Sequence, residues 1–107
     1  MFDSKLEKKF AKILTEAKIK WISQYPIFTK RYDFYLPDYK ILVEIDGDFF
    51  HTNTKAGFKF DKKFKKRIAR NDALKNLIAK KQGFKLIRIW ETDLKTLNES
   101  KLKELLK

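Results

Sequence analysis

Apolar and polar residues alternate along the segment 32–36, YDFYL, and a period of two is typical of a β-strand. In such a strand Tyr32, Phe34 and Leu36 share one apolar face, while Asp33 lies on the other face. A Pro-Asp dipeptide follows and supplies the chemistry of a tight turn. The pattern therefore predicts the first arm of a hairpin, with one carboxylate beside its apolar face.

The second arm is predicted at residues 41–45, ILVEI, where an apolar run rich in β-branched residues is typical of a strand buried on both faces. Side chains alternate in a strand, so Glu44 and Asp46 lie on the same face. Pairing of the two arms brings Asp33 to that face, and His51 follows nearby. Because crowded carboxylates repel one another, the cluster indicates a cation site.

The N-terminal region predicts a helix and an edge strand. Apolar residues recur at helical spacing over residues 4–18. Ser4 and Glu7 match a capping box, in which Glu7 bonds back to the start of the helix. Glu7 also borders the apolar stripe, so an orientation toward the sheet is the alternative. Residues 21–28 predict a strand at a sheet edge or one with a bulge, because Pro26 has no backbone donor.

The C-terminal half predicts a long helix over residues 58–82, a strand over 84–90 and a short closing helix capped by Thr92 or Asp93. The expected apolar stripe of the long helix is Phe60, Phe64, Ile68, Leu74, Leu77 and Ile78. The strand is expected to place Ile87 and Ile89 opposite Leu86, Arg88 and Trp90. The whole order, α-β-β-β-α-β-α, predicts an α/β fold with a mixed β-sheet flanked by helices, which is restriction-endonuclease-like by analogy.

Composition narrows the class of protein. A chain of 107 residues with 43% apolar residues predicts one domain, residues 1–107, with a core of its own. The absence of cysteine excludes disulfides, thiolate zinc sites and thiol nucleophiles, and it suits a reducing compartment. The chain shows no signal peptide and no membrane span. We therefore expect a soluble protein in the cytoplasm, or an intracellular protein encoded by a phage.

The charge balance, 26 Lys and Arg against 14 Asp and Glu, gives a net charge of +12 and favours a polyanionic partner. Nucleic acid is the leading candidate, an anionic membrane or acidic partner is an alternative, and a solubilising lysine coat is the simplest explanation. The first half of the long helix is the most basic segment. The expected DNA contacts are Lys62, Lys63, Lys66, Arg67 and Arg70, with Thr52 and Asn53 as weaker candidates.

Several segments together resemble one nuclease family. They are Glu7 on the first helix, Asp33 within YDFYLP, the segment 43–51 VEIDGDFFH, and the segment 70–94 with Asp72 near its start. They resemble the very short patch repair (Vsr) endonucleases and the homing-endonuclease catalytic domains with an EDxHD signature, within the PD-(D/E)xK superfamily. The chain is also similar to small nucleases of the DUF559 type. The resemblance spans nearly the whole chain.

The resemblance implies a divalent-metal-dependent DNA endonuclease, which nicks DNA or cuts both strands, from a homing, phage or mobile-element source. It implies Mg²⁺ as cofactor, with Mn²⁺ as a substitute. Asp33 is the expected principal metal ligand. The second ligand is Asp46, beside the backbone carbonyl of Ile45, or else Glu44.

The implied catalytic residues are Glu7, Asp33, His51 and Asp72. The sole histidine, His51, is a general base or a phosphate contact, because its pKa lies near working pH. Glu7 binds a water of the metal's coordination shell or orients His51, and Asp72 orients or charge-tunes His51. A surface acid that neutralises nearby lysines is the alternative role for Asp72.

The chain departs from the family in three respects. It lacks the cysteine-rich zinc site of the repair enzymes, and Asp46 stands where those enzymes have a second histidine. The catalytic lysine of the wider superfamily is absent near Asp46. The identity of the general base therefore stays open, and the alternative function is a catalytically inactive DNA-binding module of the same fold. We expect a monomer or homodimer, with an additional DNA-binding domain or partner protein as a possible supplement.

Overall fold

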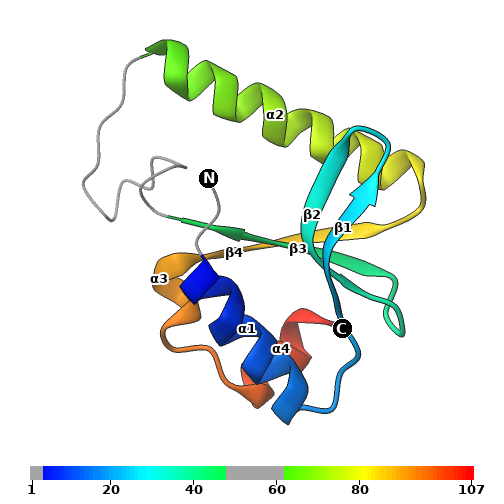
Figure 1. Cartoon of the computed structure of the whole chain (residues 1–107), viewed down its shortest axis with the longest axis vertical. Helices are drawn as coiled ribbons and strands as arrows, with labels where there is room; N and C mark the ends of the chain where they lie inside the picture. The colour runs from blue at the N-terminus through cyan, green and yellow to red at the C-terminus, as the bar shows by residue number, and fades with distance from the viewer. Residues whose placement is uncertain (1–3, 48–61) are drawn as a thin grey trace.

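A computed structural model describes residues 4–47 and 62–107 (Figure 1). Its elements are α1 (Ser4–Glu16), β1 (Ile22–Ile27), β2 (Lys30–Leu36), β3 (Ile41–Asp46), α2 (Lys62–Lys81), β4 (Lys85–Trp90), α3 (Glu91–Leu94) and α4 (Glu99–Leu105). The α/β class, the mixed sheet and the predicted element order are confirmed. None of the helices within these two ranges combines the length and apolar character that crossing a bilayer requires.

The four strands form one sheet in the order β1-β2-β3-β4. The first three strands pair antiparallel as successive hairpins, whereas β3 and β4 pair parallel, with α2 in the connection between them. Strand β1 lies at an edge, as its proline predicts. Strand β3 lies inside the sheet, and Ile41, Leu42 and Val43 are buried on both of its faces.

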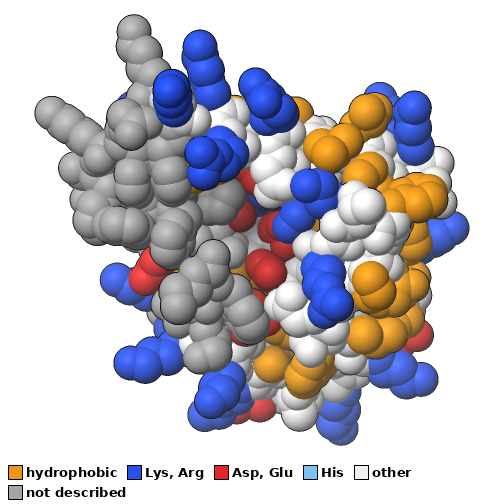
Figure 2. All heavy atoms as spheres, turned by 45° about the horizontal axis from the view of Figure 1, so that its top comes forward, with side chains coloured by type: hydrophobic (Ala, Val, Ile, Leu, Met, Phe, Trp, Pro, Cys, Tyr) orange, Lys and Arg blue, Asp and Glu red, His pale blue; other side chains and the backbone are white. Residues whose placement is uncertain are grey.

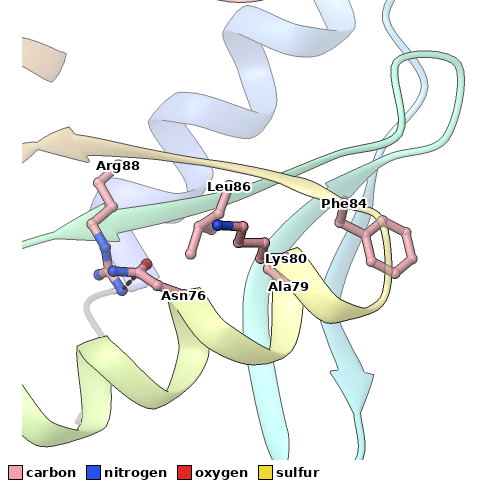
Figure 3. Close-up of a pocket in the computed structure, with 6 residues that line it drawn as sticks. All are labelled: Asn76, Ala79, Lys80, Phe84, Leu86 and Arg88. Atoms are coloured by element: carbon pink, nitrogen blue, oxygen red, sulfur yellow. Dashed lines mark hydrogen bonds between the residues drawn. The ribbon is translucent and has the colours of Figure 1, made fainter.

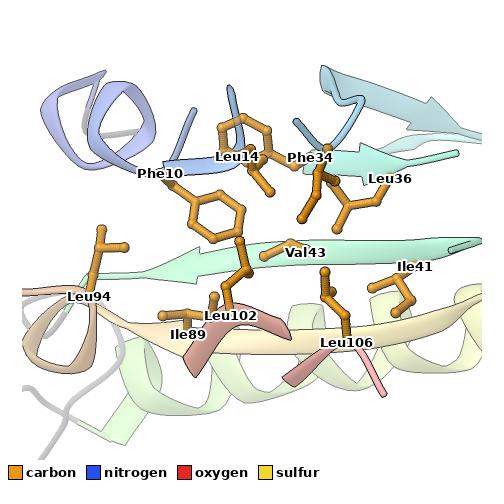
Figure 4. Close-up of a cluster of buried hydrophobic side chains, with 11 residues drawn as sticks. Phe10, Leu14, Phe34, Leu36, Ile41, Val43, Ile89, Leu94, Leu102 and Leu106 are labelled. Carbon is orange, nitrogen blue, oxygen red and sulfur yellow. The ribbon is translucent and has the colours of Figure 1, made fainter. Parts of the chain in front are cut away.

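One face of the sheet carries the main hydrophobic core, where α1, α3 and α4 pack (Figure 1). Figure 4 shows Phe10 and Leu14 of α1 meeting Phe34 and Val43 of the sheet. The rings of Phe10 and Phe34 meet edge to face at 5.1 Å. Burial of a Leu or Phe side chain contributes about 1.5–3 kcal/mol. This face therefore supplies most of the hydrophobic stabilisation.

The opposite face, under α2, is more polar, and here the predicted apolar stripe is wrong in part. Leu74 and Leu77 are 41% and 49% exposed. Ala79 is the one buried residue among the α2 side chains that the structure describes. The helix instead turns Asn71 and Lys75 toward the sheet, because the sheet presents carboxylates and hydroxyls there.

The predicted alternation along β2 also fails at one position. Tyr32 packs with Leu42 and Ala79 under α2, whereas Phe34 and Leu36 belong to the core on the other face. The change occurs at Asp33, and the backbone opposite it is irregular. Two residues that should share a face are therefore buried on opposite faces.

The closing helix divides into α3 and α4, which corrects the prediction of one helix capped by Thr92 or Asp93. Helix α3 begins after Trp90 without a side-chain cap. Asn98 has extended backbone angles, and its Oδ1 accepts a 2.9 Å hydrogen bond from the backbone N–H of Lys101. Asn98 therefore starts a second helix, because its amide satisfies a free donor there.

Candidate active site

The candidate site is centred on Asp33, where the β1-β2-β3 ladder is irregular. Gln24 and Asp33 lie opposite each other between the Ser23–Phe34 and Tyr25–Tyr32 pairs. Gln24 has a φ of 51°, a left-handed value that is uncommon for a residue other than glycine. The backbone pairing of β2 with β3 ends at Phe34. Side chains take over the hydrogen bonding beyond that point.

Two carboxylates link β2 to β3 beyond the last backbone pair. The backbone N–H of Asp33 donates to Glu44 Oε2 at 2.9 Å. The backbone N–H of Ile45 donates to Asp33 Oδ2 at 2.7 Å. Each strand therefore holds a carboxylate from the other strand, and the positions of Asp33 and Glu44 are fixed by the backbone.

The pKa of Asp33 is raised to about 7. Burial of the carboxylate is the largest cause, and the negative charges of Glu44 and Glu7 raise the pKa further. The hydrogen bond from Ile45 and the positive charge of Lys75 act in the opposite direction without cancelling the rise. Burial and the two neighbouring carboxylates therefore make the negative charge of Asp33 unfavourable in the folded protein.

The second oxygen of Asp33 is open. Oδ1 has no hydrogen-bond partner among the described residues, and none of their buried side-chain oxygens or nitrogens lacks a partner. Oδ1 must therefore be reached by solvent. Asp33 combines a fixed oxygen, an open oxygen and an unfavourable negative charge, which is the chemistry that suits a hard cation.

Glu44 has its own cation. It is 5% exposed, and its Oε1 forms an ion pair with Lys75 Nζ of α2. Lys75 Nζ also lies 5.4 Å from the centre of the Tyr32 ring. The Tyr32 hydroxyl in turn donates to the backbone carbonyl of Lys75 at 2.8 Å. Helix α2 is therefore fixed to the sheet at the position where Glu44 is neutralised.

Glu7 points from α1 at the sheet, which is the second of the two orientations considered from the sequence. It is 8% exposed, and its carboxylate accepts hydrogen bonds of 3.1 and 3.3 Å from Gln24 Nε2. Gln24 is the residue opposite Asp33, so this contact places Glu7 close enough to raise the pKa of Asp33.

Asp46 and Asp72 share one arginine. Arg88 Nη1 of β4 lies 3.3 Å from Asp46 Oδ1 and 3.3 Å from Asp72 Oδ1. Arg88 Nη2 donates to the backbone carbonyl of Asp72 and to Asn76 Oδ1, both at 3.4 Å. Glu44 contacts Lys75 of α2, and Asp46 contacts Arg88 beside α2. Both acids therefore lie on the α2 face of the sheet, as their alternation in the strand predicts. The structure gives Asp46 a protein cation, Arg88.

A basic surface lies along α2. Among the described side chains of its first half, the exposed cations are Lys63, Lys65, Lys66, Arg67 and Arg70. Figure 2 shows acidic side chains near the centre of one face of the molecule, with Lys and Arg side chains above and beside them. Such a row of cations suits a polyanion.

Several predicted site residues lie outside the described ranges, and their roles stay predictions. They are His51, Thr52 and Asn53, together with the side chain of Lys62. Within the described residues, no three acidic or histidine side chains are arranged to hold a metal ion by themselves. The structure does bring Glu7 and Glu44 within electrostatic reach of Asp33.

Sequence reasoning missed three members of this site: Gln24, Lys75 and Arg88. Arg88 had a usable signal, because parallel pairing of β3 with β4 places it beside Glu44 on the face that carries the carboxylates. Lys75 had a weaker signal, since it lies one helical turn after Asp72. Gln24 had none, because its position depends on an irregular backbone.

Comparison with known proteins adds no assignment: no family model matches the sequence, and no curated protein matches it.

Proposed function

We propose that the chain is a divalent-metal-dependent DNA endonuclease that hydrolyses phosphodiester bonds. The observation that supports this most directly is Asp33, whose pKa is raised to about 7 beside Glu44 and Glu7 while one of its oxygens stays open. The basic surface of α2 beside this cluster suits a phosphate backbone. The resemblance to Vsr-like and EDxHD nucleases supports the same class of enzyme.

The donor set fits Mg²⁺ or Mn²⁺, because it consists of carboxylate and carbonyl oxygens. Asp33 would be the principal ligand, together with Asp46 or Glu44 and the carbonyl of Ile45. The chemistry that a bound ion supplies is neutralisation of charge at the phosphate and activation of the attacking water.

The residues of the chain have separate roles in this proposal. Lys66, Arg67 and Arg70 hold phosphates of the substrate against α2. Lys75 and Arg88 hold Glu44 and Asp46 in place by neutralising them. Glu7 accepts a hydrogen bond from Gln24 and so holds the irregular backbone opposite Asp33 in place. His51 is the proposed general base or phosphate contact, and Asp72 is proposed to act on it.

DNA is the proposed partner, and the cytoplasm, or the interior of a phage-infected cell, is the proposed location. A domain of this size offers little surface for recognising a DNA sequence. We therefore also propose that a further DNA-binding domain or partner protein supplies specificity. A monomer with one site would nick DNA, whereas a homodimer would cut both strands.

Cleavage of supercoiled plasmid in the presence of Mg²⁺ tests the function. We expect wild-type protein to give nicked or linear product, and Asp33→Ala to give none while still binding DNA. Asp93→Ala is the matched control, because Asp93 is an exposed acid on α3, on the other face of the sheet. Equal cleavage by wild type and Asp33→Ala would refute the assignment.

One observation favours the alternative, a DNA-binding module without catalytic activity. Glu44 and Asp46 already form ion pairs with Lys75 and Arg88, as acids with a structural role do. Salt-sensitive DNA binding without strand breakage under Mg²⁺ or Mn²⁺ would support this alternative.

A further inference from the structure

A pocket of about 440 Å³ lies between the C-terminal half of α2 and β4. Its lining residues are Asn76, Ala79, Lys80, Phe84, Leu86 and Arg88. Figure 3 shows Arg88 and Asn76 at one end, Phe84 at the other end, and Lys80 reaching across Leu86 between them. The pocket therefore combines three apolar side chains, Ala79, Phe84 and Leu86, with three polar ones.

The apolar end is an aromatic surface. The ring of Phe84 is half-buried and meets Tyr35 edge to face at 5.3 Å. Tyr35 stacks on Tyr25 at 4.4 Å, so the aromatic row continues across the sheet. Lys40 Nζ lies 5.9 Å from the centre of the Phe84 ring. Lys40 Nζ lies over one face of this ring, and an aromatic ring beside a cation is a surface on which a nucleobase stacks.

The polar end suits the rest of a nucleotide. Lys80 is exposed and carries no ion pair among the described residues, so its ammonium is available to a phosphate. Asn76 offers an amide that reads base edges through donor and acceptor groups. Arg88 bonds Asn76 and Asp46, so the pocket adjoins the candidate active site through a shared side chain.

We propose that this pocket binds one nucleotide of an unpaired DNA segment, with the base against Phe84 and Leu86 and the phosphate beside Lys80. A paired base cannot enter, because both of its faces and its hydrogen-bonding edge are occupied within the duplex. The pocket thus confers a preference for single-stranded or locally opened DNA. The inference rests on the proposed function for its ligand class, nucleic acid, but not on cleavage.

The pocket can be located by NMR in metal-free buffer, with thymidine 5′-monophosphate as the probe. We expect amide shift changes across residues 76–88, weaker changes with thymidine, and weaker changes again with inorganic phosphate. Changes confined to the N-terminal half of α2, or no difference among the three probes, would overturn the assignment.

The preference for unpaired DNA can be measured by fluorescence anisotropy, with a labelled oligothymidine and a blunt duplex in EDTA. Phe84→Leu should weaken binding of the single strand about tenfold or more and change duplex binding little. Phe28→Leu is the matched control, because Phe28 is 74% exposed in the β1-β2 turn. Equal effects of the two substitutions would contradict the proposal.

Lys80→Gln keeps the proposal testable if Phe84→Leu is unstable. Since Lys80 is exposed, this variant should fold normally and lose affinity for thymidine 5′-monophosphate but not for thymidine. Lys12→Gln is its control, because Lys12 is exposed on α1, on the other face of the sheet. Neither measurement contains a divalent ion. A protein that binds as described but cleaves no DNA would therefore refute the proposed enzyme and leave this site standing.

Discussion

The backbone N–H of Ile45 donates a 2.7 Å hydrogen bond to the carboxylate of Asp33, which belongs to the neighbouring strand. This bond replaces a backbone contact of the sheet, and it keeps an acid half-buried beside two other acids. The charged form of Asp33 is therefore unfavourable in the folded protein, and its ionisation should change the free energy of unfolding with pH.

The stability of the metal-free protein should fall as pH rises from about 4 to about 7 because of Asp33. The pKa of Asp33 is raised from 3.8 to about 7, so the folded state holds this proton more tightly than the unfolded state. By linkage, the decrease in the free energy of unfolding is complete once the pH exceeds the pKa of Asp33 in the folded state. Its upper limit is about 4 kcal/mol. Urea unfolding in EDTA should show Asp33→Asn to be more stable than wild type at about pH 8 and similar to it at about pH 4.

The exposed acid Asp93 provides the control for this measurement, because Asp93→Asn should follow the wild-type pH dependence. If the stability of Asp33→Asn depends on pH as strongly as that of the wild type, the pH dependence belongs to another group.

Addition of Mg²⁺ should raise the melting temperature of the wild type by several degrees, since an ion that binds only the folded state stabilises it by mass action. Asp33→Asn should remove the shift. Comparison of Glu44→Gln with Asp46→Asn then identifies the second ligand, because only its substitution should reduce the shift strongly. Sodium chloride at matched ionic strength controls for screening, and an equal shift with either salt would argue against a specific site.

Lys75→Met should destabilise the fold by about 3–5 kcal/mol, because it leaves the buried carboxylate of Glu44 without its cation. The double variant Lys75→Met/Glu44→Gln should recover part of that loss. Urea unfolding of the two single variants and the double variant gives the coupling energy directly. If the loss of stability in the double variant equals the sum of the losses in the two single variants, the ion pair itself contributes no coupling energy.

Neutralising the exposed cations of α2 should weaken DNA binding without regard to sequence. Each of Lys66→Gln, Arg67→Gln and Arg70→Gln should lower the slope of log K against log salt by about 1, if the residue contacts a phosphate. Lys103→Gln on α4 is the control, because that lysine pairs with Glu99 on the other face of the sheet. If none of the three α2 variants changes the slope of log K against log salt, DNA binds to another surface of the protein.

The sequence predicted the elements and the strand pairing well, because these follow from periodicity and turn residues. The buried run 41–45 became the inner strand β3, and Pro26 marked an edge strand. Two side-chain orientations were wrong. Tyr32 changed faces because the backbone is irregular at Gln24 and Asp33, which no periodicity encodes.

The second wrong orientation concerned Leu74 and Leu77, which are exposed because α2 turns its polar residues toward the sheet. Ion pairs between segments far apart in the chain decided that orientation, and hydrophobic spacing carries no information about them. For the same reason the acids Glu44 and Asp46 were selected from the sequence, whereas their cationic partners Lys75 and Arg88 were missed.

The two faces of the sheet are covered by different kinds of interaction. Helices α1 and α4 are held by a hydrophobic core, whereas α2 is held by Lys75, Asn71 and Asp72 through polar contacts, with Ala79 as its buried residue. Such a helix can lift from the sheet in a partial opening that leaves the strands intact. Amide hydrogen exchange should therefore divide the molecule into a slow layer containing α1 and the sheet, and a faster, ionic-strength-dependent layer formed by α2.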